Sequence, residues 1–218
     1  MDVIKQPKSL AEQTYDILLN AISSGDFEPG KRLNQDELAA RLNVSRQPVN
    51  SAISVLKANG FVEDTGRRGV VVTQITLDQF LSLYEFRTAI DPFAVRLAHS
   101  RKPPDAHKQA QEMIKRGWSA VRSQDPKTQI EIDFEFHKMI YDWAGNITIS
   151  DTMRLHWHHI RRAMGVVLRQ GVPSQTSWEE HERVIEALMA GLVERAEDEM
   201  RRHLANAQTK TSAVLSQV

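Results

Sequence analysis

Apolar residues between positions 34 and 60 are spaced as in two short helices separated by a tight turn. Leu38, Ala39 and Leu42 form one apolar stripe, and Asn43-Val44-Ser45 interrupts it with residues that favour a turn and the start of a helix. The next stripe has the i, i+3, i+4, i+7 spacing of a buried helix face and consists of Val49, Ala52, Ile53 and Leu56. This pattern predicts a helix-turn-helix.

The pattern changes again after Gly60, where the second helix is expected to end. Phe61-Val62 and the run 70–72 are short stretches of β-prone residues, and the segment 64–69 between them contains two glycines and two arginines. We therefore expect a short hairpin, a β wing, tipped by Arg67 and Arg68.

The polar residues of the second helix are predicted to face away from its apolar stripe. Guanidinium and amide groups in the first turn of such a helix can pair with base edges in a major groove, each good bidentate pair being worth roughly 1–3 kcal/mol of discrimination. Arginines at a wing tip suit phosphate or minor-groove contact. An ordinary small helical bundle is the alternative interpretation. The expected DNA-binding residues are Ser45, Arg46, Gln47, Pro48, Asn50, Arg67, Arg68 and Gly69.

The rest of the chain has a helical pattern almost throughout. One helix is expected upstream, over Leu10–Ser23, and glycine, proline and polar breaks after Leu77 divide the remainder into six. The predicted fold class is mainly α, with an N-terminal winged helix-turn-helix over residues 1–75 and a C-terminal all-α bundle over residues 76–218. The six helices are predicted over 77–100, 104–123, 126–144, 147–170, 175–190 and 192–212.

Composition narrows the class of protein. The 218 residues include 28 basic and 28 acidic ones and no cysteine, which excludes a disulfide framework, a thiolate nucleophile and a cysteine zinc site. No apolar run approaches the length of a membrane span, and the start lacks a signal-peptide core, so we expect a cytoplasmic protein. Between Arg41 and Val72 five basic residues face two acidic ones. The excess of positive charge is thus confined to the expected DNA-reading surface. We also expect two copies of the protein on each DNA site.

Four residues of the helical part form a candidate metal-binding set. Asp133 and His137 are four positions apart and so project from one face of a helix. His181 and His203 follow on later helices. One carboxylate and three imidazoles suit Zn, Ni, Mn or Fe better than Mg or Ca. On spacing alone, a surface ion pair is the simpler interpretation of the first two residues.

Several ordered motifs resemble known families. Residues 10–72 resemble the winged helix of GntR-type bacterial transcription regulators, through PGKRL and ELAARLNVSRQPVNSAISVLKANGFVE. Residues 80–205 resemble the FCD effector domain of the FadR-like branch, through YEFRTAIDPFAVRLA, IDFEFHKMIYDWAGN, EEHERVIEAL and MRRHL. One position departs from the pattern. Asn50 stands where the family commonly has arginine after SRxPV, and asparagine pairs with adenine where arginine favours guanine.

The resemblance adds a metal and a ligand to this picture. Many FCD domains carry metal at the four motif positions filled here by Asp133, His137, His181 and His203, which implies a divalent transition metal. Open coordination positions would accept the carboxylate of a small organic or sugar acid. Arg87, in the FRTAIDP motif, is our candidate to hold the far end of that acid. An ion pair with Asp91, its i+4 neighbour, is an equally supported role.

Together these features predict a ligand-responsive transcription repressor. We expect a homodimer on a near-palindromic DNA operator, released or repositioned when an acid binds at the metal, with the second domain serving effector binding and dimerisation. The chain has no G-x-S-x-G, P-loop, G-x-G-x-x-G or H-E-x-x-H motif, so we do not expect an enzyme. Two alternatives remain: a metal-dependent hydrolase using the Asp/His set, and a DNA-binding protein whose second domain only dimerises.

Overall fold

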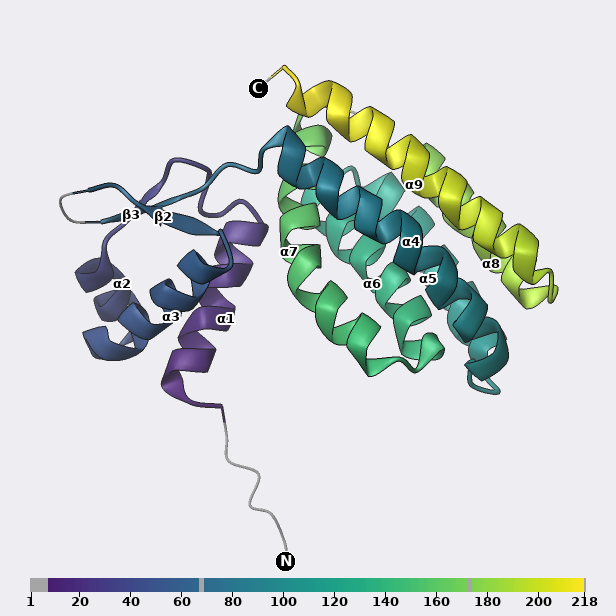
Figure 1. The fold of residues 1–218 in the computed structure, drawn as a ribbon, viewed down its shortest axis with the longest axis horizontal. Coiled ribbons are helices and arrows are strands. Elements are labelled where there is room, and N and C mark those ends of the chain that lie inside the picture. The colour runs from purple at the N-terminus through teal and green to yellow at the C-terminus, as the bar shows by residue number, and fades with distance from the viewer. Residues whose placement is uncertain (1–7, 67–68, 172–173, 218) are drawn as a thin grey trace, which may run out of the picture. The chain divides into compact units, whose positions relative to one another are not determined.

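The computed structural model in Figure 1 describes residues 8–66, 69–171 and 174–217. The chain divides into two compact units, Met1–Gln74 and Ile75–Val218. The first combines short helices with a small sheet, and the described part of the second is helical. The predicted fold class, mainly α with an N-terminal winged helix-turn-helix and a C-terminal all-α bundle, is confirmed.

The N-terminal unit packs three helices beside a three-stranded antiparallel sheet of order β1-β3-β2. Strand β3 pairs on one edge with β1, at Leu33 opposite Val70, and on the other with β2, at Val62 opposite Val72. The β2–β3 hairpin is the predicted wing. The elements are α1 (Leu10–Ser23), β1 (Arg32–Leu33), α2 (Gln35–Leu42), α3 (Arg46–Ala58), β2 (Val62–Asp64) and β3 (Val70–Val72).

Local residue chemistry sets the turn between α2 and α3. The side chain of Asn34 caps α2 by accepting from the backbone of Asp36, 2.9 Å away. Asn43 ends α2 in the left-handed conformation, with a φ of 51°, which asparagine tolerates better than most residues. Ser45 holds the predicted N-cap position of α3, but its side chain makes no cap hydrogen bond.

In its described residues, the C-terminal unit consists of six helices close to the predicted ranges. Helix α5 begins at Ala106 rather than 104 because Pro104 and Asp105 lie in a turn closed by the amide of Ala106 and the carbonyl of Pro103. Helix α9 runs three residues beyond the predicted end. The elements are α4 (Leu77–Arg101), α5 (Ala106–Ser123), α6 (Pro126–Ala144), α7 (Ile147–Arg169), α8 (Gln175–Met189) and α9 (Val193–Leu215).

The core of this unit lies where its long helices meet. Figure 1 shows α4, α9 and α8 running side by side, and α4 also packs on α6. Large side chains fill the space between the helices, among them Phe80, Phe136, Trp157 and Trp178, all fully buried. Among the described helices, none is long and apolar enough to cross a membrane.

Candidate functional site

The start of α3 presents polar side chains to solvent. Arg46, Gln47 and Asn50 are exposed, whereas Val49 and Ala52 are buried beneath them. Pro48, which we grouped with the reading residues, is buried. It lies one turn before Ala52 on the packed face, so its ring supports the helix rather than facing a ligand.

A groove lies beside this surface, between the helix starts and the wing. Its lining includes Arg32, Asn34, Asp36, Arg46 and Gly69. The guanidinium Nε of Arg46 lies 2.9 Å from Oδ1 of Asp36 on α2, and both side chains are exposed. Arg32 was not among the predicted residues. It belongs to the PGKRL motif that carries the family resemblance, and that motif could have suggested it.

Gly69 shapes the wing side of the same groove. Its φ of 151° favours glycine, and a Cβ there would lie 3.1 Å from Nε of Arg32. Glycine therefore lets the wing backbone run close to that guanidinium. Arg67 and Arg68 lie outside the described residues.

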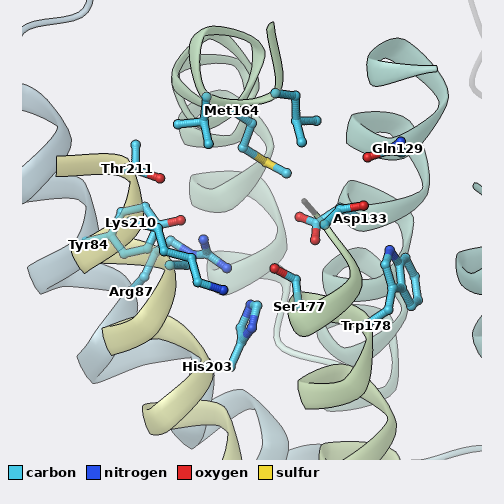
Figure 2. A pocket seen from close by; sticks show the side chains of 14 residues that line it. Tyr84, Arg87, Gln129, Asp133, Met164, Ser177, Trp178, His203, Lys210 and Thr211 are labelled. Atoms are coloured by element: carbon cyan, nitrogen blue, oxygen red, sulfur yellow. The ribbon is translucent and has the colours of Figure 1, made fainter. Parts of the chain in front are cut away.

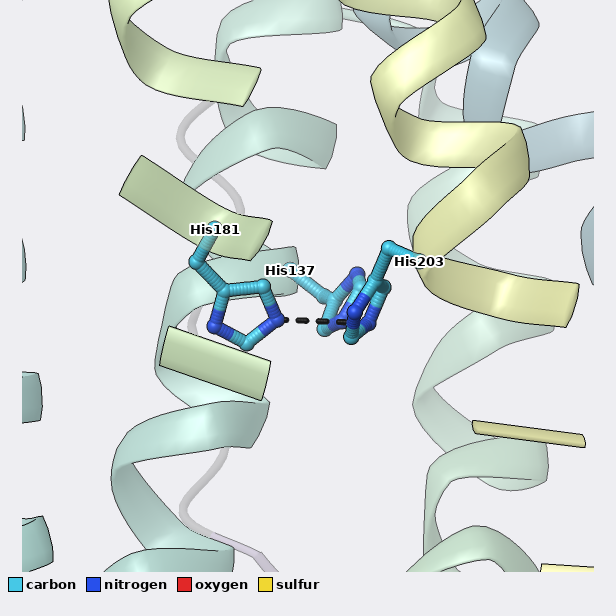
Figure 3. A group of neighbouring side chains, drawn as sticks. All are labelled: His137, His181 and His203. Carbon is cyan, nitrogen blue, oxygen red and sulfur yellow. Dashed lines mark hydrogen bonds between the residues drawn. The ribbon is translucent and has the colours of Figure 1, made fainter. Parts of the chain in front are cut away.

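Three histidines meet in the interior of the helical unit (Figure 3). His137 comes from α6, His181 from α8 and His203 from α9. Each offers a ring nitrogen, and these atoms all lie within 4.8 Å of one another. Nε2 of His181 and Nε2 of His203 are 3.2 Å apart. All three side chains are buried, so the ring nitrogens are shielded from water.

Asp133 borders this cluster. Its Oδ1 lies 3.6 Å from Nε2 of His181, and its side chain is buried. The structure therefore brings three of the four predicted ligands into one group and places the carboxylate next to one member of it.

The protonation states favour metal binding. Burial, together with the positive charge of Arg87, holds the pKa of His137 well below its ordinary value, and burial does the same for His181. Neutral imidazoles offer the lone pair that a metal requires. Burial raises the pKa of Asp133 to about 6, which leaves a carboxylate at neutral pH.

The spacing of His181 and His203 fits one ion. Nitrogen ligands about 2.0–2.1 Å from a zinc ion lie roughly 3.0–3.4 Å apart. The 3.2 Å between the two Nε2 atoms falls in that range. The donor set, three buried imidazoles with a carboxylate beside them, suits a divalent transition metal.

Arg87 is buried beside the histidines and held by an acid. Its Nη2 lies 2.8 Å from Oδ2 of Asp91, and Asp91 also accepts a 2.7 Å hydrogen bond from the hydroxyl of Tyr141. The same Nη2 lies 3.2 and 3.3 Å from the two ring nitrogens of His137. The guanidinium carbon is 4.7 Å from the ring centre of Trp157. The ion pair with Asp91 is thus present, and Arg87 also reaches the cavity beside the histidines.

That cavity has a volume of about 70 Å³. At 10–15 Å³ for each water centre, it has room for about five waters or one small ligand. Figure 2 shows polar groups entering from different helices: Arg87 from α4, Asp133 from α6, Ser177 from α8, and His203 and Lys210 from α9. The cavity offers cationic, hydroxyl and carboxylate groups within one pocket.

Trp178 forms part of the cavity wall because α5 carries a glycine opposite it. A Cβ on Gly117 would lie 2.0 Å from the indole of Trp178, closer than any real contact. The indole also lies 4.8 Å, centre to centre, from the ring of His181. Gly117 thus allows one aromatic side chain to line the cavity and to pack on the histidine cluster.

Family models match both units. The model described as bacterial regulatory proteins, gntR family, matches residues 10–72, and the FCD domain model matches residues 82–206.

Individual proteins match along most of the chain. It is similar to an uncharacterised helix-turn-helix transcriptional regulator, YdhC, of Bacillus subtilis (strain 168), with 23% identity over 84% of this chain and 82% of that protein. It is also similar to a probable D-xylose utilization operon transcriptional repressor of Paenarthrobacter nicotinovorans, with 25% identity over 90% of this chain and 86% of that protein. Among solved structures, McbR/YncC of E. coli has the same fold, with a TM-score of 0.80 and 21% identity over 97% of this chain and 99% of that one.

Proposed function

Because the chain belongs to the GntR family of bacterial regulatory proteins and carries an FCD domain, we propose that this transcriptional regulator represses by binding a near-palindromic operator as a homodimer. A small carboxylate or sugar acid, bound beside a metal in the helical unit, releases it from the DNA. The matched relatives are transcriptional regulators and not enzymes, so the hydrolase alternative is set aside. The observation that carries the proposal is the convergence of three buried histidines beside a cavity lined by two cationic side chains.

The exposed first turn of α3 reads the operator in this proposal. Arg46, Gln47 and Asn50 project from the helix, and their side chains suit major-groove base edges. Ser45 and Gly69 bring backbone close to the DNA, and Arg32 adds a cation for phosphate. The wing arginines Arg67 and Arg68 remain proposed phosphate contacts on sequence grounds. Two copies of this surface would read the two halves of the operator.

The metal would be held by His137, His181 and His203, with Asp133 as a fourth ligand. When bound, a divalent Zn, Ni, Mn or Fe ion supplies coordination positions for a ligand oxygen. Burial lowers the pKa of His137 and of His181, which keeps these two imidazoles neutral, and all three side chains are shielded from bulk water. The protein also carries the site on three separate helices, so binding there is coupled to how these helices pack.

Two cations would hold the acid. Arg87 is fixed by Asp91 and offers a rigid guanidinium edge at the cavity wall, while Lys210 enters from α9. Lys210 lines the cavity, and its charge also lowers the pKa of Glu180, so it would attract a second carboxylate that enters there. Ser177 and Gln129 supply polar groups for hydroxyls on the same ligand. The small volume favours compact acids.

Release follows from a difference in affinity. An acid can shift the protein away from DNA only by as much as it prefers the form with low DNA affinity. If the second unit only dimerises the protein, no acid should change its affinity for DNA.

The test is DNA binding measured with and without acids. An operator is first selected from random duplexes with the full chain loaded with zinc, and fluorescence anisotropy then follows its release by a panel of small mono- and dicarboxylic hydroxy acids. The proposal expects at least one acid to raise the apparent Kd of the wild type and to leave that of His137→Ala unchanged. An operator bound equally well with every acid would contradict the proposed regulation.

A further inference from the structure

Glu180 lies outside the histidine cluster but contacts one of its members directly. Its Oε2 lies 2.9 Å from Nδ1 of His203, and its Oε1 accepts a 2.7 Å hydrogen bond from the side chain of Asn206. Glu180 is 2% exposed and His203 is 3% exposed. The carboxylate is therefore held in place on one side by Asn206 and faces the imidazole on the other.

This contact determines which nitrogen of His203 carries the hydrogen. A carboxylate only accepts, so Nδ1 must be the donor, and in a neutral imidazole Nε2 then keeps its lone pair. That Nε2 is the atom that lies 3.2 Å from Nε2 of His181 (Figure 3). Glu180 thus stands on the far side of the ring from the point where the histidines meet, and it turns the lone pair toward that point.

Among the described residues, the carboxylates nearest to the other two histidines lie farther away, at 3.7 Å from His137 and 3.6 Å from His181. Nδ1 of His181 is buried with no hydrogen-bond partner in the described part of the chain. The ring nitrogens of His137 face the guanidinium of Arg87. When His203 is neutral and donates from Nδ1 to Glu180, the short contact requires His181 to donate from Nε2, and His181 must move this hydrogen to Nδ1 before both nitrogens can bind an ion.

We propose that Glu180 is a positioning residue of the metal centre, which fixes His203 as the ligand that is correctly oriented before the ion arrives. This inference rests on the proposed function, in which the three histidines hold a metal. Groups that orient a metal-binding histidine typically change metal affinity 10–100-fold. Asn206, which holds the other oxygen of Glu180, supports the same arrangement.

Two variants test the role. In Glu180→Gln the shape is kept and the charge is lost, and the amide can turn either its oxygen or its NH2 group toward Nδ1. Glu180→Ala removes the acceptor. Glu186→Gln, at an exposed position of the same helix, is the matched control. Each full-length protein is stripped of metal and titrated with Zn²⁺ against a chromophoric chelator.

We expect Zn²⁺ binding to weaken about tenfold in Glu180→Gln and toward a hundredfold in Glu180→Ala, with no change in Glu186→Gln. Long-range ¹H–¹⁵N NMR of the metal-free proteins adds a measurement that a purely structural role would not alter. It should show the Nδ1–H form of His203 in the wild type and a mixture of both forms in Glu180→Gln. The glutamine variant decides the question if the alanine variant fails to fold.

A glutamine variant with wild-type Zn²⁺ affinity and an unchanged His203 tautomer would overturn the inference. A wild type that binds no Zn²⁺ would instead overturn the metal part of the proposed function, and with it the role of Glu180 at a metal. The two failures are therefore distinguishable in one experiment.

Discussion

Nε2 of His181 and Nε2 of His203 lie 3.2 Å apart in the interior of the helical unit, although 22 positions separate the two residues in the chain. Two nitrogen lone pairs at this distance repel each other unless a proton or a cation lies between them. Packing of α8 on α9 creates this contact, and burial holds the pKa of His181 well below its ordinary value. The contact therefore calls for one shared hydrogen in the metal-free protein or for a cation between the two nitrogens.

Acid should destabilise the metal-free protein through these histidines. The pKa values of His137 and His181 are depressed in the folded state, chiefly by burial, so the unfolded chain binds more protons once the pH falls below their ordinary value of about 6.5. Their contribution is present above that pH and is lost as the pH falls toward the folded pKa. Asp133 has the opposite effect on stability. Its pKa is raised to about 6 in the folded state, so its contribution to stability grows as the pH falls. We expect the melting temperature to fall more steeply between pH 7 and 5 in the wild type than in His181→Gln.

Parallel slopes for the two proteins in calorimetry at matched ionic strength would contradict the depressed pKa of His181.

Arg46→Ala should remove specific DNA binding without unfolding the protein. Its side chain is exposed on α3 and makes a surface ion pair with Asp36, which contributes little to stability. Loss of one bidentate base contact should cost about 1–3 kcal/mol of discrimination. Anisotropy with selected and scrambled duplexes measures this, with the exposed Arg154→Ala as control. A preserved preference for the selected duplex would remove Arg46 from the reading surface.

Lys210→Met should abolish the response to acids and leave Zn²⁺ affinity within a factor of about two, because Lys210 lines the cavity without belonging to the histidine group. Lys210→Arg should keep part of the response, since it retains the charge. Lys138, which is exposed and paired with Asp142, provides the control Lys138→Met. Release of the operator by acid at the wild-type midpoint in Lys210→Met would show that this lysine does not hold the ligand.

Gly117→Ala should displace Trp178 and so disturb the cavity. The new Cβ would overlap the indole, and such overpacking typically costs about 1–3 kcal/mol of stability. Gly165→Ala is the matched control, because its Cβ would meet only the flexible end of Arg169, at 3.3 Å. Chemical denaturation and tryptophan fluorescence measure the effect. Equal stability and equal spectra for the two alanine variants would contradict the packing of Trp178 on Gly117.

The sequence could predict the elements and part of the site. Apolar periodicity located the helices because each buries one face, and Asp133 and His137 fall on one face by spacing alone. The approach of His181 to His203 depends on how α8 packs on α9, which periodicity does not encode.

Lys210 could have been found, since it lies seven positions, or two turns, after His203. The buried Pro48 could also have been set apart, because it lies one turn before Ala52 on the packed stripe.

Glu180 could not have been found in this way. It follows Glu179 and precedes His181 on one helix, so adjacent spacing alone suggests that it points away from the histidine beside it. Its contact is with the histidine of another helix, and only the three-dimensional packing reveals it.

Elemental analysis by mass spectrometry tests the central claim most directly, on tag-free protein purified without chelator or added metal. The metal-centred account predicts about one divalent transition-metal ion per chain in the wild type and in the exposed control His107→Ala, and loss of that ion in His137→Ala. A wild type that is free of metal, and that cannot be reloaded with Zn²⁺, Ni²⁺, Mn²⁺ or Fe²⁺, would contradict it.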